Sequence, residues 1–180
     1  MDSLVVVLAQ DLLYVVALVA AGVWLLRERP SGRIELAVAG VVALLVAVVL
    51  VKVAGAVHSD PRPFVQNPSL HPLFPHPADD GFPSDHSTVA MAIAVVVAWR
   101  HRVIGAVLAL CAVVIGLARV AAHVHHLQDV AAGWVLGAVA GAIGLFVASL
   151  LVSRFARGRE VRAPWDRDVV ETSTGSAYRR

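Results

Sequence analysis

The sequence predicts an all-α membrane protein, a polytopic bundle of about five spanning helices. Of its 180 residues, 58% are apolar and only 16% are charged, whereas a soluble domain has roughly a quarter charged residues. The apolar residues also gather in five segments that more polar connections separate. This composition excludes a disordered chain, a coiled coil and a nucleic-acid-binding protein with a basic face.

The apolar segments are considered in chain order against the roughly 20 residues that a spanning helix needs. We expect the first helix at residues 4–26; it does not resemble a signal peptide, because no Lys or Arg precedes it and Asp11 interrupts it. Asp11 is expected either at the outer membrane interface or near the functional site. The other helices are expected at residues 34–57, 84–99, 103–118 and 127–152.

The basic residues predict how the bundle is oriented. Twelve of the 15 fall in the first connection, the third connection and the C-terminal segment. The positive-inside rule makes that side cytoplasmic. Residues 1–152 then form the transmembrane domain, and residues 153–180 form an arginine-rich cytoplasmic tail attracted to anionic lipid. Lys52, Arg62 and Arg119 are expected on the outer side with seven of the eight histidines, so we expect chemistry at that end.

A histidine and an aspartate open the last predicted helix. His125 and Asp129 are four residues apart, so they share one helix face. A carboxylate bound to one imidazole nitrogen leaves the other as a nucleophile or base. Glycines continue this face at Gly133, Gly137 and Gly141 and permit close approach of another helix. Asp129 is therefore expected in the bundle interior; the alternative is a polar helix cap followed by a homodimerisation face.

Residues 82–88 have the composition of a helix N-terminus, with Pro and a Ser or Asp cap. Free backbone N–H groups there can bind an anion. Ser84 could add a hydroxyl donor, and His86 could donate a proton. The same pattern is also typical of an ordinary helix cap.

Three cations complete the predicted outer cluster. Arg62 and Arg119 each offer a planar fork of donors suited to phosphate oxygens, although an arginine at a membrane boundary can also extend to the lipid headgroups. Lys52 lies more than one turn inside its span, where ionisable groups usually have a function. The combination suits phosphoryl transfer from a lipid.

These residues also carry a family resemblance. Three ordered motifs resemble those of the type 2 phosphatidic acid phosphatase (PAP2) superfamily: Arg62-Pro63, then Pro83-Ser84-Asp85-His86, then Arg119, His125 and Asp129. The spacing of the third motif selects His125 over its neighbours His123 and His126. With Asp85 where the family usually has Gly, the second motif is similar to that of the bacitracin-resistance type of bacterial undecaprenyl diphosphate phosphatase.

The resemblance implies a PAP2-like core and a two-step mechanism with neither metal nor cofactor. His125 attacks the terminal phosphorus and forms a phosphohistidine, while Asp129 orients it. His86 protonates the leaving oxygen and then activates water. Four residues are implied to hold the phosphate: Arg62, Arg119, Ser84 and Lys52.

Two positions depart from the family pattern. Nine residues separate Lys52 from Arg62, where the family has a shorter spacing, so His58 is an alternative phosphate ligand. Ala118 stands where the family usually has a serine before the third-motif arginine.

The resemblance further implies a reaction and a location. Undecaprenyl diphosphate is hydrolysed to undecaprenyl phosphate and inorganic phosphate at the extracytoplasmic face of the bacterial inner membrane, which recycles a lipid carrier for cell-wall synthesis. The expected partners are a polyprenyl diphosphate and membrane lipids. One alternative is a PAP2 phosphatase for phosphatidic acid, phosphatidylglycerol phosphate or a prenyl-linked sugar phosphate. The other is a non-enzymatic membrane protein whose histidines bind haem or a metal.

Overall fold

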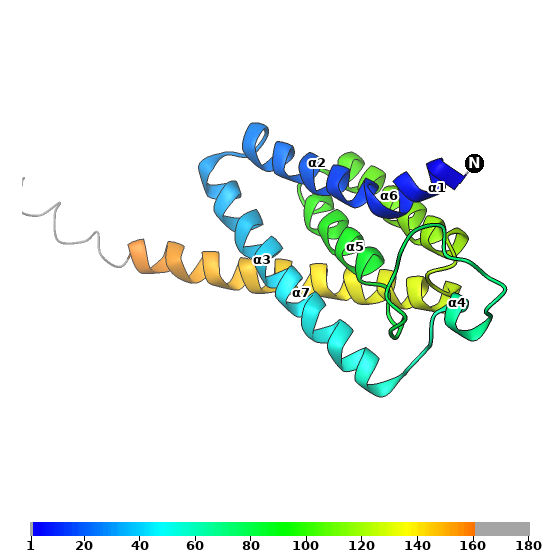
Figure 1. Cartoon of the computed structure of the whole chain (residues 1–180). Helices are drawn as coiled ribbons and strands as arrows, with labels where there is room; N and C mark the ends of the chain where they lie inside the picture. The colour runs from blue at the N-terminus through cyan, green and yellow to red at the C-terminus, as the bar shows by residue number, and fades with distance from the viewer. Residues whose placement is uncertain (1, 161–180) are drawn as a thin grey trace, which may run out of the picture. The chain divides into compact units, whose positions relative to one another are not determined.

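A computed structural model describes residues 2–160, with side chains described as far as residue 154, so most of the predicted tail at 153–180 lies outside the described residues. The described part is helical and has no strand beyond one isolated bridge between Pro61 and Asp80. Its helices are drawn in Figure 1: α1 (Asp2–Gln10), α2 (Leu12–Leu26), α3 (Pro30–Val57), α4 (Pro63–Gln66), α5 (Asp85–Ala98), α6 (Arg102–Ala121) and α7 (Leu127–Glu160). Residues 1–148 form one compact unit.

The first predicted helix is broken at Asp11. Its two halves, α1 and α2, are bent by 43° relative to each other. At the break, the carbonyl of Ala9 accepts a hydrogen bond from the Arg119 side chain at 3.2 Å. The bend therefore supplies a backbone acceptor to a buried arginine.

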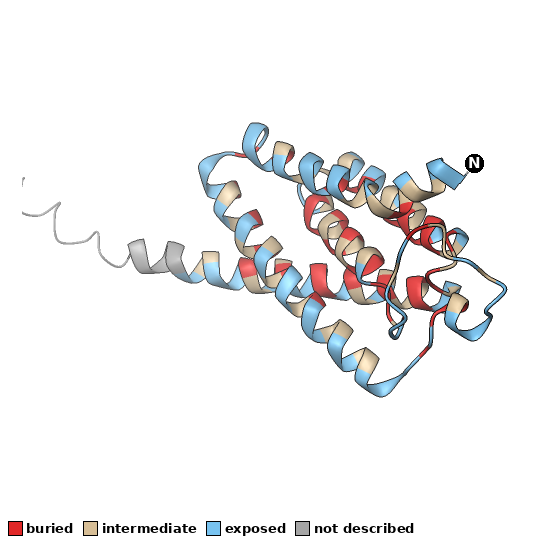
Figure 2. Cartoon of the chain, viewed as in Figure 1, coloured by how far each residue is buried: buried red, intermediate tan, exposed pale blue. Residues whose placement is uncertain are grey.

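Helices occur at all five expected positions, but not all of them are long enough to span a membrane. By length and composition, three helices can cross a membrane, namely α3, α6 and the Leu127–Arg154 part of α7, and the bent α1–α2 pair makes a fourth if it is one span. The remaining helix, α5, has only 14 residues. It packs against α2, α3 and α6, and Figure 2 shows it rich in buried residues. A short helix that is apolar all round is typical of a bundle interior.

The glycine stripe of α7 packs against α5. A Cβ atom on Gly133 would lie 2.7 Å from the Ser84 carbonyl oxygen, and one on Gly141 would lie 2.8 Å from Cβ of Val95. The prediction that these glycines admit another helix is therefore confirmed. That helix belongs to the same chain, so the stripe does not support a homodimer, which stays a prediction.

The two basic connections meet at one end of the bundle. Glu28 lies 3.0 Å from Nε of Arg100 and 2.7 Å from Nε2 of His101. Glu35 lies 3.2 Å from Nη1 of Arg100. Since Arg119 stands near the opposite end of α6, the predicted separation of a basic end from a candidate functional end is confirmed.

Candidate active site

Four of the predicted site residues line one polar cavity of about 220 Å³: Arg62, His86, Arg119 and His125. They come from the loop after α3, the start of α5, the end of α6 and the turn before α7. Residues that are far apart in the sequence thus converge, as the three motifs predict.

A tight turn places the His125 imidazole. After α6, His123 adopts a left-handed backbone conformation with φ of 60°, which ends the helix and redirects the chain. His125 follows, and its side chain is only 4% exposed. Its Nδ1 lies 3.3 Å from Oδ2 of Asp129, a carboxylate that is fully buried.

The neighbours of His125 define its tautomer. Nη1 of Arg62 lies 3.4 Å from Nε2 of His125. A guanidinium can only donate, so Nε2 carries the lone pair and Nδ1 donates its proton to Asp129. Burial lowers the pKa of His125, the hydrogen bond to Asp129 opposes this, and Arg119 and Arg62 lower it further. The imidazole is therefore neutral at neutral pH, with its nucleophilic nitrogen beside a cation.

Asp129 links two of the motifs. Its Oδ2 also accepts a hydrogen bond from the backbone N–H of His126 at 2.8 Å. Its backbone carbonyl accepts from the N–H of Ser84 at 3.0 Å. Oδ1 has no partner among the described residues. Asp129 thus orients His125 and fixes the start of α5 next to it.

Arg62 is buried and held by two segments, the loop before α5 and the turn before α7. Nη1 donates to the Val124 carbonyl at 2.8 Å, and Nε donates to Oδ1 of Asp79 at 2.8 Å. The Asp79 side chain is 61% exposed, and the hydrogen bond from Arg62 lowers its pKa. The Arg62 guanidinium thus already binds one anionic oxygen at the edge of the cavity. The same donors suit the oxyanion of a ligand.

Arg119 carries a free donor. Its side chain is buried, and Nη2 lies 3.0 Å from Nε2 of His76. Its Nε is buried and has no hydrogen-bond partner within the part of the chain that is described. A buried N–H left unpaired is costly, so an anion bound in the cavity would satisfy it.

The other predicted ligands are placed differently. His86 lines the cavity from the first turn of α5. Ser84 is fully buried, and its hydroxyl accepts from Oγ of Ser87 at 3.1 Å instead of lining the cavity. Lys52 is exposed on α3 and does not line the cavity, although the preceding Val51 does. His58, the alternative, is also exposed and packs edge-on against the Phe82 ring.

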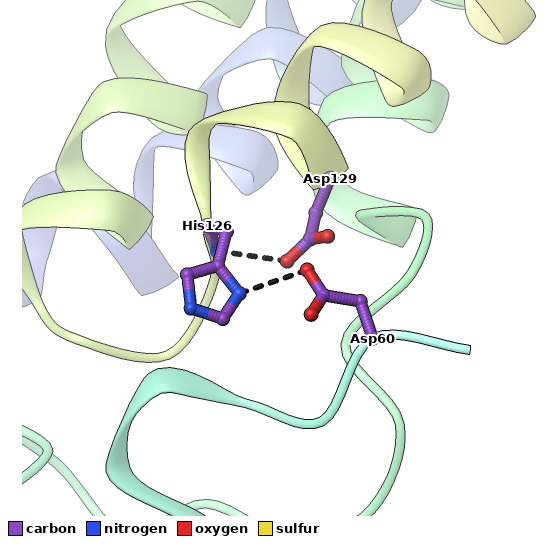
Figure 3. Close-up of side chains that lie close together, drawn as sticks. All are labelled: Asp60, His126 and Asp129. Carbon is purple, nitrogen blue, oxygen red and sulfur yellow. Dashed lines mark hydrogen bonds and ion pairs between the residues drawn. The ribbon is translucent and has the colours of Figure 1, made fainter. Parts of the chain in front are cut away.

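A carboxylate network not found by motif analysis lies beside the site. Figure 3 shows Asp60, His126 and Asp129, whose ligand-type atoms lie within 4.8 Å of one another. Oδ2 of Asp60 accepts from Nδ1 of His126 at 2.8 Å and from Nε2 of Gln128 at 2.6 Å. The Gln66 side chain donates to Oδ1 at 3.1 Å.

Both oxygens of Asp60, Nδ1 of His126 and Oδ2 of Asp129 are paired within this network, and Oδ1 of Asp129 is not. A metal ion bound there would compete with these donors and would draw Asp129 away from His125. We therefore interpret the cluster as a hydrogen-bond network that joins the first motif to the third. It also accounts for His126, whose Nδ1 is engaged by Asp60 and not by the cavity.

The comparison with known families settles what kind of protein carries this site. The model of the PAP2 superfamily matches residues 36–153. The chain belongs to the PAP2 superfamily. The match includes all three motifs and leaves α1, α2 and the first residues of α3 outside. With its apolar helices, this membership makes the chain an integral membrane protein of a lipid phosphatase family.

Individual relatives agree with this assignment. The chain is 32% identical over 137 residues to the bacitracin transport permease protein BcrC of Bacillus licheniformis, an alignment that covers 76% of this chain and 66% of that protein. It therefore spans just under two thirds of this relative's length. It is 31% identical over 143 residues to the undecaprenyl-diphosphatase BcrC of Bacillus subtilis (strain 168), covering 78% of this chain and 72% of the relative.

A solved structure supports the fold. The chain is similar to Aquifex aeolicus LpxE, with a TM-score of 0.62 and 28% sequence identity. The similarity covers 80% of this chain and 84% of that one. The prediction of an all-α PAP2-like membrane bundle is confirmed.

Proposed function

We propose that this protein hydrolyses undecaprenyl diphosphate to undecaprenyl phosphate and inorganic phosphate. The observation that carries the proposal is the 3.4 Å distance between Nε2 of His125 and Nη1 of Arg62 at a polar cavity. From it we infer that Nε2 is the nucleophile and that Arg62 donates to the oxyanion. The undecaprenyl-diphosphatase among the relatives supports the choice of lipid.

The first half-reaction transfers phosphorus to nitrogen. Nε2 of His125 attacks the terminal phosphorus, an N–P bond forms, and the bond from phosphorus to the bridging oxygen breaks. His86 donates a proton to that oxygen as undecaprenyl phosphate leaves. Asp129 stabilises the positive charge that develops on the imidazole ring.

The second half-reaction restores the enzyme. His86, now neutral, accepts a proton from a water molecule whose oxygen attacks the phosphorus. The N–P bond breaks, inorganic phosphate leaves, and the electron pair returns to Nε2. Arg62 and Arg119 stabilise the phosphoryl oxygens in both steps, which is the main demand of phosphoryl transfer. Because they supply the positive charge, we expect activity without added metal.

A second cavity suits the lipid part of such a substrate. It has a volume of about 330 Å³ and lies between α2, α3 and α5. Its lining is apolar, as the side chains of Leu36, Val41 and Ile93 illustrate. The cavity lies toward the basic end of the bundle, beside Trp24 and Val97, so it would hold a distal part of an isoprenoid chain whose head group occupies the polar cavity.

We infer the membrane face on which the polar cavity opens from the distribution of basic residues. The positive-inside rule assigns the end that carries Arg27, Arg100 and Arg102 to the cytoplasm. The cavity would then open on the extracytoplasmic side of a bacterial inner membrane. Undecaprenyl phosphate released there would be available for another round of carrier use.

A substrate panel tests the proposal. The purified protein in detergent would receive undecaprenyl diphosphate, phosphatidic acid or phosphatidylglycerol phosphate, each with and without a chelator. We expect the highest kcat/KM with undecaprenyl diphosphate and no effect of chelation. Preference for a phospholipid would support another PAP2 lipid phosphatase, and absence of any phosphate release would favour a non-enzymatic binding protein.

A further inference from the structure

The loop between α4 and α5 is attached to the active site at both of its ends. The N–H of Leu73 donates to the Ala122 carbonyl at 3.2 Å, next to the end of α6. Oδ1 of Asp80 accepts from the N–H of Asp60 at 2.8 Å. His76 lies between these attachments, with its ring centroid 6.3 Å from that of His125. The loop thus brings a third imidazole next to the catalytic pair.

Two contacts specify the protonation of His76. Its Nε2 lies 3.0 Å from Nη2 of Arg119. Because a guanidinium has no acceptor, Nε2 must be the unprotonated nitrogen. Its Nδ1 lies 3.3 Å from the Pro77 carbonyl, which can only accept. Both contacts are satisfied by the same neutral tautomer, with the proton on Nδ1.

The charges around His76 favour that neutral form. Burial lowers its pKa, and Arg62, Arg119 and His125 lower it further, against a smaller opposing effect of the Pro77 carbonyl. His86 on α5 and Asp79 on the same loop also interact electrostatically with His76. Arg62, Arg119 and the protonated form of His86 lie on three separate segments, and each disfavours a positive charge on His76.

The two site arginines differ in the charge of their partners. Arg62 donates to a carboxylate, that of Asp79. Arg119 donates to two neutral acceptors, the Ala9 carbonyl and His76. A neutral acceptor fixes the direction of a guanidinium while leaving its positive charge available to a ligand.

We propose that His76 is a positioning residue, whose neutral imidazole holds the Arg119 guanidinium in the orientation that binds the substrate's phosphate. This inference rests on the proposed function in that Arg119 is taken as a phosphate ligand. It adds a role for a loop histidine that none of the three motifs contains.

Protonation of His76 should also change how kcat/KM depends on pH. Protonation of His76 removes the acceptor and places a second cation against Arg119, so the guanidinium loses its orientation. Protonation of His125 removes the nucleophile. In the free enzyme, which kcat/KM reports, protonation of His76 should therefore add one unit to the slope of the acid limb of log kcat/KM, beyond the effects of His125, of the proton that His86 must carry and of the substrate.

Three variants test the inference: His76→Ala, His76→Gln and, as a control, His71→Ala. Glutamine keeps a neutral acceptor that does not titrate, and the control histidine is exposed on the same loop, with only its backbone carbonyl engaged. We would measure the Kd of inorganic phosphate by calorimetry, KM and kcat for undecaprenyl diphosphate, and the pH profile. Thermal unfolding would show that each variant is folded.

We expect His76→Ala to weaken phosphate binding and raise KM by about tenfold, the effect of losing one charged hydrogen bond, with a smaller change in kcat. His76→Gln should recover most of the affinity and lower the slope of the acid limb by one unit relative to the wild type. His71→Ala should match the wild type. Unchanged phosphate affinity in His76→Ala, or a glutamine variant that retains the wild-type slope, would overturn the inference.

These measurements distinguish failure of the positioning role of His76 from failure of the proposed function. Wild-type turnover with phosphate affinity independent of His76 would keep the function and reject the positioning role. Phosphate binding that depends on His76, without turnover of any lipid, would keep the positioning role and reject the function. If His76→Ala fails to fold, the His76→Gln pH profile decides.

Discussion

At the scale of single residues, the site depends on how each histidine is held. His125 faces the cavity with Asp129 behind it, His126 is bound to Asp60, and His123 has the left-handed backbone that ends α6. Three histidines within four positions thus have three separate tasks. Their side-chain partners agree with the spacing of the third motif, which already selects His125 as the candidate nucleophile.

The lowered pKa of His125 predicts the acid limit of activity. Acidification protonates Nε2 and removes the nucleophile, so kcat/KM should fall as the pH passes the pKa of the free enzyme. Because burial and the two arginines hold that pKa below the usual value, the fall should begin below about pH 6.5. A kcat/KM profile between pH 4 and 8 checks this. An acid-limb midpoint above 6.5 would show that His125 is not the buried group described here.

Some of these residues are predictable from the sequence and others are not. His125, Asp129, Arg62, Arg119 and His86 follow from spacing and charge, and the structure places them together, although their roles stay predictions. Spacing cannot locate partners that a loop contributes from elsewhere in the chain. The residues missed for this reason are Asp60, His76 and Asp79; the position of Asp60 two residues before Arg62 is the only sequence signal among them.

At the scale of helices, the α5–α7 contact sets the position of His86. We predict that Gly133→Ala destabilises the protein by about 1–3 kcal/mol, the usual cost of overpacking, and lowers activity. The added Cβ would lie 2.7 Å from the Ser84 carbonyl and 2.9 Å from Cβ of Ser87, so the start of α5 must move. Thermal unfolding and kcat/KM for undecaprenyl diphosphate measure both effects.

Gly22→Ala is the matched control. It lies in α2, and a Cβ there would meet no atom within 4 Å. We expect unchanged activity and equal or slightly higher stability, because alanine favours a helix more than glycine does. If both variants behave alike, close packing at Gly133 does not position the site.

The Asp60 network predicts coupling between the loop after α3 and the turn before α7. Asp60→Asn and His126→Ala should each lower kcat by about tenfold, because either change loosens the turn that carries His125. Together they should cost little more than one alone, since both remove the same hydrogen bond. Kinetics of the two single variants and the double variant measure this, and fully additive losses would contradict it.

Some features of the helices can be predicted from the sequence and others cannot. The four later helices begin within four residues of their expected starts, because apolar length and terminal Pro or polar residues define them, but α7 continues to residue 160 instead of ending at residue 152. The sequence shows Asp11 inside the first apolar segment, but it does not show the 43° bend there or the contact of Ala9 with Arg119, 110 residues away in the chain. Apolar composition predicts α5 as a span, but composition alone does not distinguish lipid from protein surroundings.

At the scale of the whole molecule, the proposed role in carrier recycling requires the site to lie outside the cytoplasm. We predict that a cysteine at Ser69, in a Cys111→Ala background, reacts with an impermeant reagent in intact cells. Both Ser69 and Ser31 are exposed, so Ser31→Cys at the basic end is the control and should react only after lysis. The reverse labelling pattern would invert the topology and contradict the role in carrier recycling.

The central claim is that His125 receives the phosphoryl group. The direct measurement is to quench the enzyme during turnover of undecaprenyl diphosphate labelled in its terminal phosphate, and to map the acid-labile label by peptide analysis. The account predicts a label on His125 that is absent in His125→Ala and retained in His123→Ala. A label on His86, or turnover in His125→Ala at the wild-type rate, would contradict it.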